Sequence, residues 1–181
     1  LGITAPLAGT AALASKFASD FETSFAKVRQ AVDATVPQLK AMADGIKAMA
    51  EVLPVTTTEL NQIAAMAGTL GIARENILDF TRIIAQMGPA AGVSSDQAGE
   101  ALAKIANITQ MPQKQMSNLA SAIVEVGRTS VATASQVTEM AMRLAGAGKQ
   151  VGVTNDELVG LGGALASTGI EAAAGGTAMS R

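Results

Sequence analysis

Two residue types that carry much of protein chemistry, cysteine and histidine, do not occur among the 181 residues. Without cysteine the chain has no disulfide, no thiol nucleophile and no thiolate metal ligand. Without histidine the commonest general base is missing, which excludes a Ser-His or Cys-His catalytic pair and a zinc site of the Cys/His type. We therefore expect no enzymatic activity, no cofactor and no bound metal.

Aromatic residues are scarce too. The chain contains four Phe and neither Tyr nor Trp, although hydrophobic residues make up 49% of it. Its apolar content is mostly Ala, Leu, Ile, Val and Met, of which Ala, Leu and Met rank among the strongest helix formers. Small side chains let helices approach closely, but a core with few rings gains less dispersion energy per residue. This composition predicts a helical chain of modest stability.

Neither sign of charge dominates. The formal net charge is −2 and the 13 basic residues are scattered singly, whereas nucleic-acid binding usually needs a clustered basic surface. We therefore expect no specific binding to nucleic acid. Uncharged runs such as residues 1–15 and 158–170 are shorter than the ~20 apolar residues of a membrane-spanning helix. We expect membrane contact only through segments outside this chain.

Apolar residues recur every three or four positions almost throughout, which is the period of an amphipathic helix. The first stripe lies in a helix expected at about 10–34 and includes three of the four Phe. A later helix is expected at about 74–87, where Gly88 and Pro89 are interpreted as its end. Another is expected to open at Pro112.

Five further helices are expected where a Ser or Thr precedes an apolar stripe and a Glu or Gln follows three residues later. This spacing is typical of a capping box, in which the two residues satisfy each other's free backbone N–H groups. The pairs are Thr35 with Gln38, Thr56 with Glu59, Ser94 with Gln97, Thr133 with Gln136, and Thr154 with Glu157.

The expected fold class is all-α, a multi-helix bundle of about eight helices. We expect a leading amphipathic helix at 1–35, helical units at 36–93 and 94–170, and a Gly/Ala-rich lead at 171–181 into a following segment. The second to fourth helices resemble the sixth to eighth, because Ile46 matches Ile123 and Thr56 matches Thr133 at one offset. This indicates a duplicated three-helix unit; the alternative is that two strings of amphipathic helices align through their shared period alone.

Two local patterns resemble sites of chemistry without completing them. Residues 146–150, Gly-Ala-Gly-Lys-Gln, have Arg143 where a phosphate-binding loop needs its first Gly, and Gln150 where it needs Ser or Thr. We interpret this segment as a flexible loop between helices. Asp156 and Glu157 are adjacent, but neighbours in sequence diverge on a helix, so we interpret them as first-turn acids that the helix dipole favours.

Contact residues are expected on two helices. The Phe stripe of the first helix should be interior to a helix–helix or subunit contact. Small residues four apart in the eighth helix let another backbone come close, although a locally frayed helix is the alternative. The suspected helix-packing or subunit-interface residues are Phe17, Phe21, Phe25, Val28, Gly160 and Ala164. No residue is assigned a catalytic, cofactor-binding or metal-binding role.

Several segments of the chain follow one another in a familiar order. Residues 21–35, Phe-Glu-Thr-Ser-Phe-Ala-Lys-Val-Arg-Gln-Ala-Val-Asp-Ala-Thr, combine a helix with a Thr-containing link. Residues 97–108 read Gln-Ala-Gly-Glu-Ala-Leu-Ala-Lys-Ile-Ala-Asn-Ile, and shorter similarities lie at 57–60, 70–73, 77–82, 132–137 and 175–179. Together, over about 17–181, they resemble the core region of bacteriophage tail tape-measure proteins, also called phage-related minor tail proteins.

The resemblance implies a structural component of a phage or phage-derived tail. It implies a tape-measure fragment that anchors at the tail tip or baseplate and helps set tail length and genome delivery. The implied partners are copies of itself as a trimer, tail-tube and baseplate or tail-tip proteins, and tail assembly chaperones. The implied location is the virion tail, in the tube lumen or tip, and the host cytoplasm during assembly. The alternatives are a cytosolic bacterial helical scaffold module and a membrane-active channel-forming segment released at infection.

Overall fold

The computed structural model describes the backbone of residues 5–169 and the side chains of residues 15–169. Residues 5–169 contain no strand, and the expected all-α fold with eight α-helices is confirmed. The helices are α1 (Ala5–Ala31), α2 (Val36–Val52), α3 (Thr57–Thr69), α4 (Ile77–Ala91), α5 (Ser95–Thr109), α6 (Met116–Thr129), α7 (Ala134–Val151) and α8 (Asn155–Ser167). Short 3-10 turns, η1 (Arg74–Asn76) and η2 (Gln113–Gln115), precede α4 and α6.

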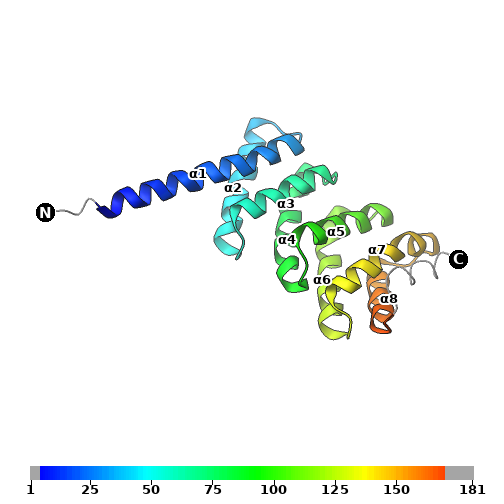
Figure 1. Cartoon of the computed structure of the whole chain (residues 1–181). Coiled ribbons are helices and arrows are strands. Elements are labelled where there is room, and N and C mark those ends of the chain that lie inside the picture. Colours follow the sequence, from blue (N-terminus) through cyan, green and yellow to red (C-terminus); the bar gives the residue numbers. More distant parts are fainter. Residues whose placement is uncertain (1–4, 170–181) are drawn as a thin grey trace.

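The helices form two rows that run along the molecule (Figure 1). The odd-numbered helices α1, α3, α5 and α7 pack side by side in one row, and α2, α4, α6 and α8 pack in the other. Each helix pair therefore packs against the next pair, and α1 and α8 lie at opposite ends of the molecule.

The repeating unit along the rows is one helix pair. The N-cap residues Thr56, Ser94 and Thr133 of α3, α5 and α7 follow one another at intervals of 38 and 39 residues. The match between Thr56 and Thr133 found in the sequence therefore spans two of these intervals. The proposed division into units at 36–93 and 94–170 stays a prediction.

The helix starts follow the expected caps with one departure. Ser94, Thr133 and Thr154 each form the reciprocal capping box, and the side chain of Gln38 accepts from the Thr35 N–H. The Thr56 hydroxyl accepts from the backbone N–H of Glu59 at 3.2 Å. The Glu59 carboxylate, however, accepts from the Ser95 hydroxyl at 2.9 Å, so it joins the start of α3 to the start of α5.

Helix ends are less well predicted. The helix expected to end at Gly88 and Pro89 continues to Ala91 with Pro89 inside it. A proline in the last turn removes only one intrahelical hydrogen bond, so the turn persists. The true end is Gly92, whose φ of 66° is left-handed, and the next residue, Val93, donates its N–H to Gly88 O at 3.2 Å.

Two other expectations about local structure were wrong. The segment 146–150, expected to be a loop, lies inside α7. Its helical state fits the packing, because Gly148 is buried and a Cβ there would lie 3.0 Å from Leu158 Cδ1. The first helix, expected at 10–34, runs from Ala5 to Ala31.

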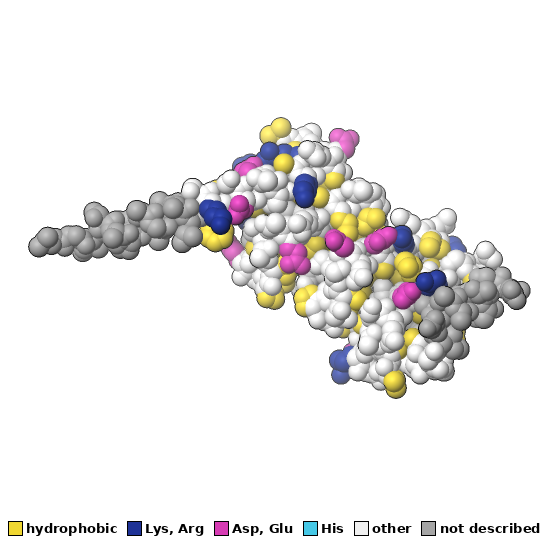
Figure 2. All heavy atoms as spheres, viewed as in Figure 1, with side chains coloured by type: hydrophobic (Ala, Val, Ile, Leu, Met, Phe, Trp, Pro, Cys, Tyr) yellow, Lys and Arg dark blue, Asp and Glu magenta, His cyan; other side chains and the backbone are white. Residues whose placement is uncertain are grey.

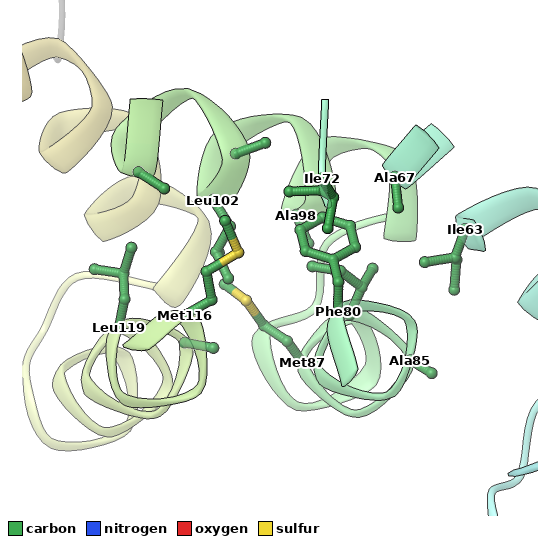
Figure 3. Close-up of a cluster of buried hydrophobic side chains, with 14 of the residues drawn as sticks. Ile63, Ala67, Ile72, Phe80, Ala85, Met87, Ala98, Leu102, Met116 and Leu119 are labelled. Atoms are coloured by element: carbon green, nitrogen blue, oxygen red, sulfur yellow. The ribbon is translucent and has the colours of Figure 1, made fainter. Parts of the chain in front are cut away.

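The apolar core lies between the two rows (Figure 3). Side chains of α3, α4, α5 and α6 meet there, with Met87 and Met116 directed toward one another. The labelled members are Ile63, Ala67, Ile72, Phe80, Ala85, Met87, Ala98, Leu102, Met116 and Leu119. Phe80 is the one aromatic ring among them, so Met and Ile supply the bulk that rings would supply in other cores.

Candidate interaction surfaces

The Phe stripe of α1 is divided by the start of α3. Phe21, Phe25 and Val28 are buried where α1 packs on α3. The side chain of Phe17 is 70% exposed, so the expected helix–helix contact for Phe17 is wrong within one chain. The reason is length: α1 begins well before the level of α3 and its N-terminal part projects from the body (Figure 1). A subunit contact for Phe17 stays a prediction.

Cations border the two buried rings of this stripe. The Phe21 and Phe25 rings are stacked with centroids 5.5 Å apart. Lys47 Nζ of α2 lies 4.5 Å from the Phe21 centroid, and the Arg29 guanidinium lies 5.3 Å from the Phe25 centroid. Both distances are within the range of cation–π attraction, so the rings connect α1 to α2 as well as to α3.

A buried polar contact, which the sequence reasoning missed, sets the register of α1 on α3. Asn61 Nδ2 donates to Ser24 Oγ at 2.8 Å and to Phe21 O at 3.4 Å. Asn61 Oδ1 is buried and has no hydrogen-bond partner within the described residues. Sliding α1 along α3 would break these bonds inside an apolar contact, where an unmade hydrogen bond is costly. The one signal in the sequence was an amide within the apolar stripe of α3.

The small-residue contact of α8 is displaced from the predicted positions. Gly160 is exposed with no atom near its Cβ position, and Ala164 is also exposed. The close approach occurs instead at Gly162 and Gly163, whose Cβ positions point at α7 and at Val126 of α6. The prediction that Gly160 and Ala164 make helix contacts within the chain was therefore wrong, because both residues lie on the outer side of α8. Their role in a subunit contact stays a prediction.

Side chains also link successive helix pairs at the loop edge where the odd-numbered helices end. Arg74 Nη1 donates to Asp33 O at 3.3 Å, and Gln113 Nε2 donates to Gly71 O at 3.3 Å. Lys149 Nζ donates to Thr109 O at 2.7 Å. Each donor lies 40 to 42 residues after its acceptor, a separation that sequence reasoning based on local spacing does not detect.

Asp156 and Glu157 lie in the first turn of α8, as expected. The Glu157 carboxylate accepts from the Thr154 N–H at 2.9 Å and from its hydroxyl at 2.8 Å. Both bonds lower the pKa of Glu157 below its ordinary value, and the bond from the backbone N–H has the larger effect. Within the described residues no group of three or more acidic side chains is placed to hold a metal ion.

A groove lies on α5 and α7, beside two ion pairs. Glu100 and Lys104 pair on α5 at 2.5 Å, and Glu139 and Arg143 pair on α7 at 2.9 Å. Over α5 and α7, Figure 2 shows acidic, basic and apolar side chains close to one another. The pairs are solvent-exposed, so each adds little to stability.

None of the helices searched, all within the part of the chain that the structure describes, is long and apolar enough to cross a membrane.

Comparison with known proteins identifies the family. The family described as phage-related minor tail protein matches residues 43–181, from α2 to the end of the chain. No curated protein matches the chain, and no solved structure matches it. The matched residues cover α3 to α8 and the greater part of α2, including the helix pairs and the groove on α5 and α7. The chain belongs to the phage-related minor tail protein family, whose members have a structural role in the phage tail.

Proposed function

We propose that the chain is part of a tape-measure protein and that it anchors one end of that protein at the tail tip or baseplate. The family match over residues 43–181 supports a tail protein. The ordered similarities to the core region, from 21–35 to 175–179, favour the tape measure among tail proteins.

The observation that carries the anchor assignment is the small length that each helix pair adds. One continuous helix of 38 residues would span about 57 Å, because a helix rises about 1.5 Å per residue. Here a repeat of 38 or 39 residues folds back on itself and moves the row forward by one helix–helix spacing, which is about 10 Å. A ruler built this way would use roughly six times as many residues per unit length, so this region suits an anchor better than a ruler.

In this proposal, copies of the chain surround the tail axis in the lumen at one end of the tube. Three copies are expected from the family resemblance, and closed cyclic symmetry would repeat each contact in every copy. The tail-tube, baseplate or tail-tip proteins and the assembly chaperones are the proposed partners. The exposed Phe17 on the projecting part of α1 supports a contact outside the single chain.

Immunogold labelling of assembled virions tests this location. A peptide tag inserted at Val131, which is 90% exposed in the loop between α6 and α7, should leave the helix pairs intact. We expect gold particles at one end of detergent-opened tails, and a tag on the tail-tube protein should label the whole length as a control. Labelling along the whole tail, or of free protein alone, would contradict the anchor assignment.

A further inference from the structure

The starting observation is an apolar side chain that the described residues leave largely exposed. Phe17 continues the stripe of Phe21 and Phe25 one helical turn beyond the point where α3 begins. Its side chain is 70% exposed, and it is one of only four aromatic residues. Burying a phenyl ring is strongly favourable, so this position is suited to a contact made by assembly.

The groove between α5 and α7 has the size for such a ring. Its volume is about 250 Å³, and its lining includes Ala98, Ala101, Thr138 and Met142. A cavity of roughly 150 Å³ is enough to hold benzene. Three of these four side chains are small.

The preceding junction in the same row explains why this groove is open. Between α3 and α5, the end of the Met66 side chain lies against Gly99 and occupies the corresponding space. One repeat further along, Lys104 stands 38 residues after Met66 and Thr138 stands 39 residues after Gly99. A charged side chain directed to solvent replaces the filling methionine, and the space between α5 and α7 stays unfilled.

The charges around Phe17 match those around the groove. Lys16 and Asp20, four residues apart, lie on the same flank of Phe17 and are exposed. Along α5 an acid, Glu100, precedes a base, Lys104, by four residues. The same order recurs on α7 with Glu139 and Arg143. If α1 of another copy lay parallel to α5 and α7, its charged flank would face one of these two helices. Lys16 would then lie beside the acid of that helix, and Asp20 would lie beside its base.

We propose that the projecting part of α1 of one copy docks in the α5–α7 groove of a second copy, with Phe17 inserted between the two ion pairs. The two surfaces lie toward opposite ends of one molecule, so a chain cannot make this contact with itself (Figure 1). The contact joins two different surfaces, and it therefore generates a ring if the rotation closes. This docking contact rests on the self-association proposed above, and it specifies which two surfaces meet.

Burial of the ring supplies the affinity, and the charges select the parallel orientation over the antiparallel one. Phe17→Ala should raise the dissociation constant for self-association by roughly ten- to a hundredfold. Thermal unfolding of the dilute variant should be unchanged because the side chain is exposed in the monomer.

Lys16→Glu should weaken association, and adding Glu139→Lys and Glu100→Lys to the same chain should restore it.

Cysteine cross-linking provides the direct test, because the chain has no cysteine of its own. One preparation carries Phe17→Cys and a second carries Ala101→Cys, and the two are mixed at a concentration raised about a hundredfold, which offsets the affinity lost with the ring, and mildly oxidised. We expect a disulfide between the two different variants, identified by mass spectrometry, and none between Phe17→Cys and the control Val131→Cys, which is exposed elsewhere.

The possible failures separate the docking contact from self-association. Cross-linking of Phe17→Cys only to itself would overturn the groove contact and indicate that α1 helices pair with one another. Oligomers in sedimentation without the mixed disulfide would also overturn it, while leaving self-association standing. A chain that stays monomeric at all concentrations would overturn this contact and the proposed self-association together.

Discussion

Phe17 and Phe21 lie one turn apart on α1 and differ in what surrounds them. Phe21 is stacked on Phe25 and buried against α3, whereas Phe17 is exposed. Phe21→Ala should lower the free energy of unfolding by about 3–5 kcal/mol, the usual cost of emptying a core position of this size. Phe17→Ala, measured on dilute protein, should change it by less than about 0.5 kcal/mol. Equal losses in chemical denaturation would show that the stripe is not divided at the start of α3.

Two glycines of α8 make a second matched comparison with opposite signs. A Cβ at Gly162 would lie 3.2 Å from the Ala141 nitrogen and 3.3 Å from the Val137 oxygen, both backbone atoms of α7. Gly162→Ala should therefore cost about 1–3 kcal/mol through overpacking, partly offset by better helix propensity.

Gly160 is the control position, because no atom lies within 4 Å of its Cβ position. Gly160→Ala should stabilise the chain by up to about 1 kcal/mol, since alanine is the better helix former. Urea denaturation of both variants measures the difference. If Gly162→Ala also stabilised the chain, α8 would not approach α7 as closely as the structure shows.

At the scale of single elements, helix starts could be predicted and helix ends could not be placed as well. A capping box is formed by two residues three apart, so Ser94 with Gln97 or Thr133 with Gln136 is visible in the sequence. Pro89 was misread because a proline in a final turn is tolerated when a left-handed residue such as Gly92 follows. The loop predicted at 146–150 was wrong because burial of Gly148 decides its state, and burial depends on distant residues.

Gln113 links two helix pairs. Its Oε1 accepts from the Ala73 N–H and from Asn76 Nδ2, both at 2.9 Å. Gln113→Ala removes the acceptor of a partly buried N–H and should cost about 1–3 kcal/mol. Hydrogen exchange of the Ala73 amide should become faster, while the neighbouring control Lys114→Ala should leave it unchanged. Protection of Ala73 that persisted in Gln113→Ala would show that this bond does not join the two pairs.

At the scale of the whole molecule, the all-α class could be predicted from the composition and from the helical spacing of apolar residues. The arrangement of the helices in two rows could not. The rows depend on contacts such as that of Asn61 with Ser24, which are 37 residues apart in sequence and are set by packing. The candidate surfaces likewise include one feature that is visible locally in the sequence and one that depends on distant residues. Phe21, Phe25 and Val28 are buried and belong to an apolar stripe, which is a local pattern that the sequence shows. Phe17 is exposed because α3, which is distant in the sequence, begins only at Thr57 and does not reach it.

The anchor assignment makes a different prediction for tail length than a ruler would. Deleting residues 56–88 removes α3 and most of α4, and with them the junction between α1 and α5. The loss interrupts both rows, so the remaining helix pairs cannot stack as they do in the intact chain. If the parent protein is a tape measure as proposed, an in-frame deletion in its ruler segment serves as the matched control, and it should give tails that are shorter but otherwise normal.

Electron microscopy of lysates from phage carrying the 56–88 deletion tests this most directly. We expect that tails fail to start or that their tips are disordered, with no uniform class of shortened tails. A ruler in the form of a continuous helix would lose about 50 Å for these 33 residues. Normal tails shortened uniformly by that length would contradict the anchor assignment and make this region part of the ruler.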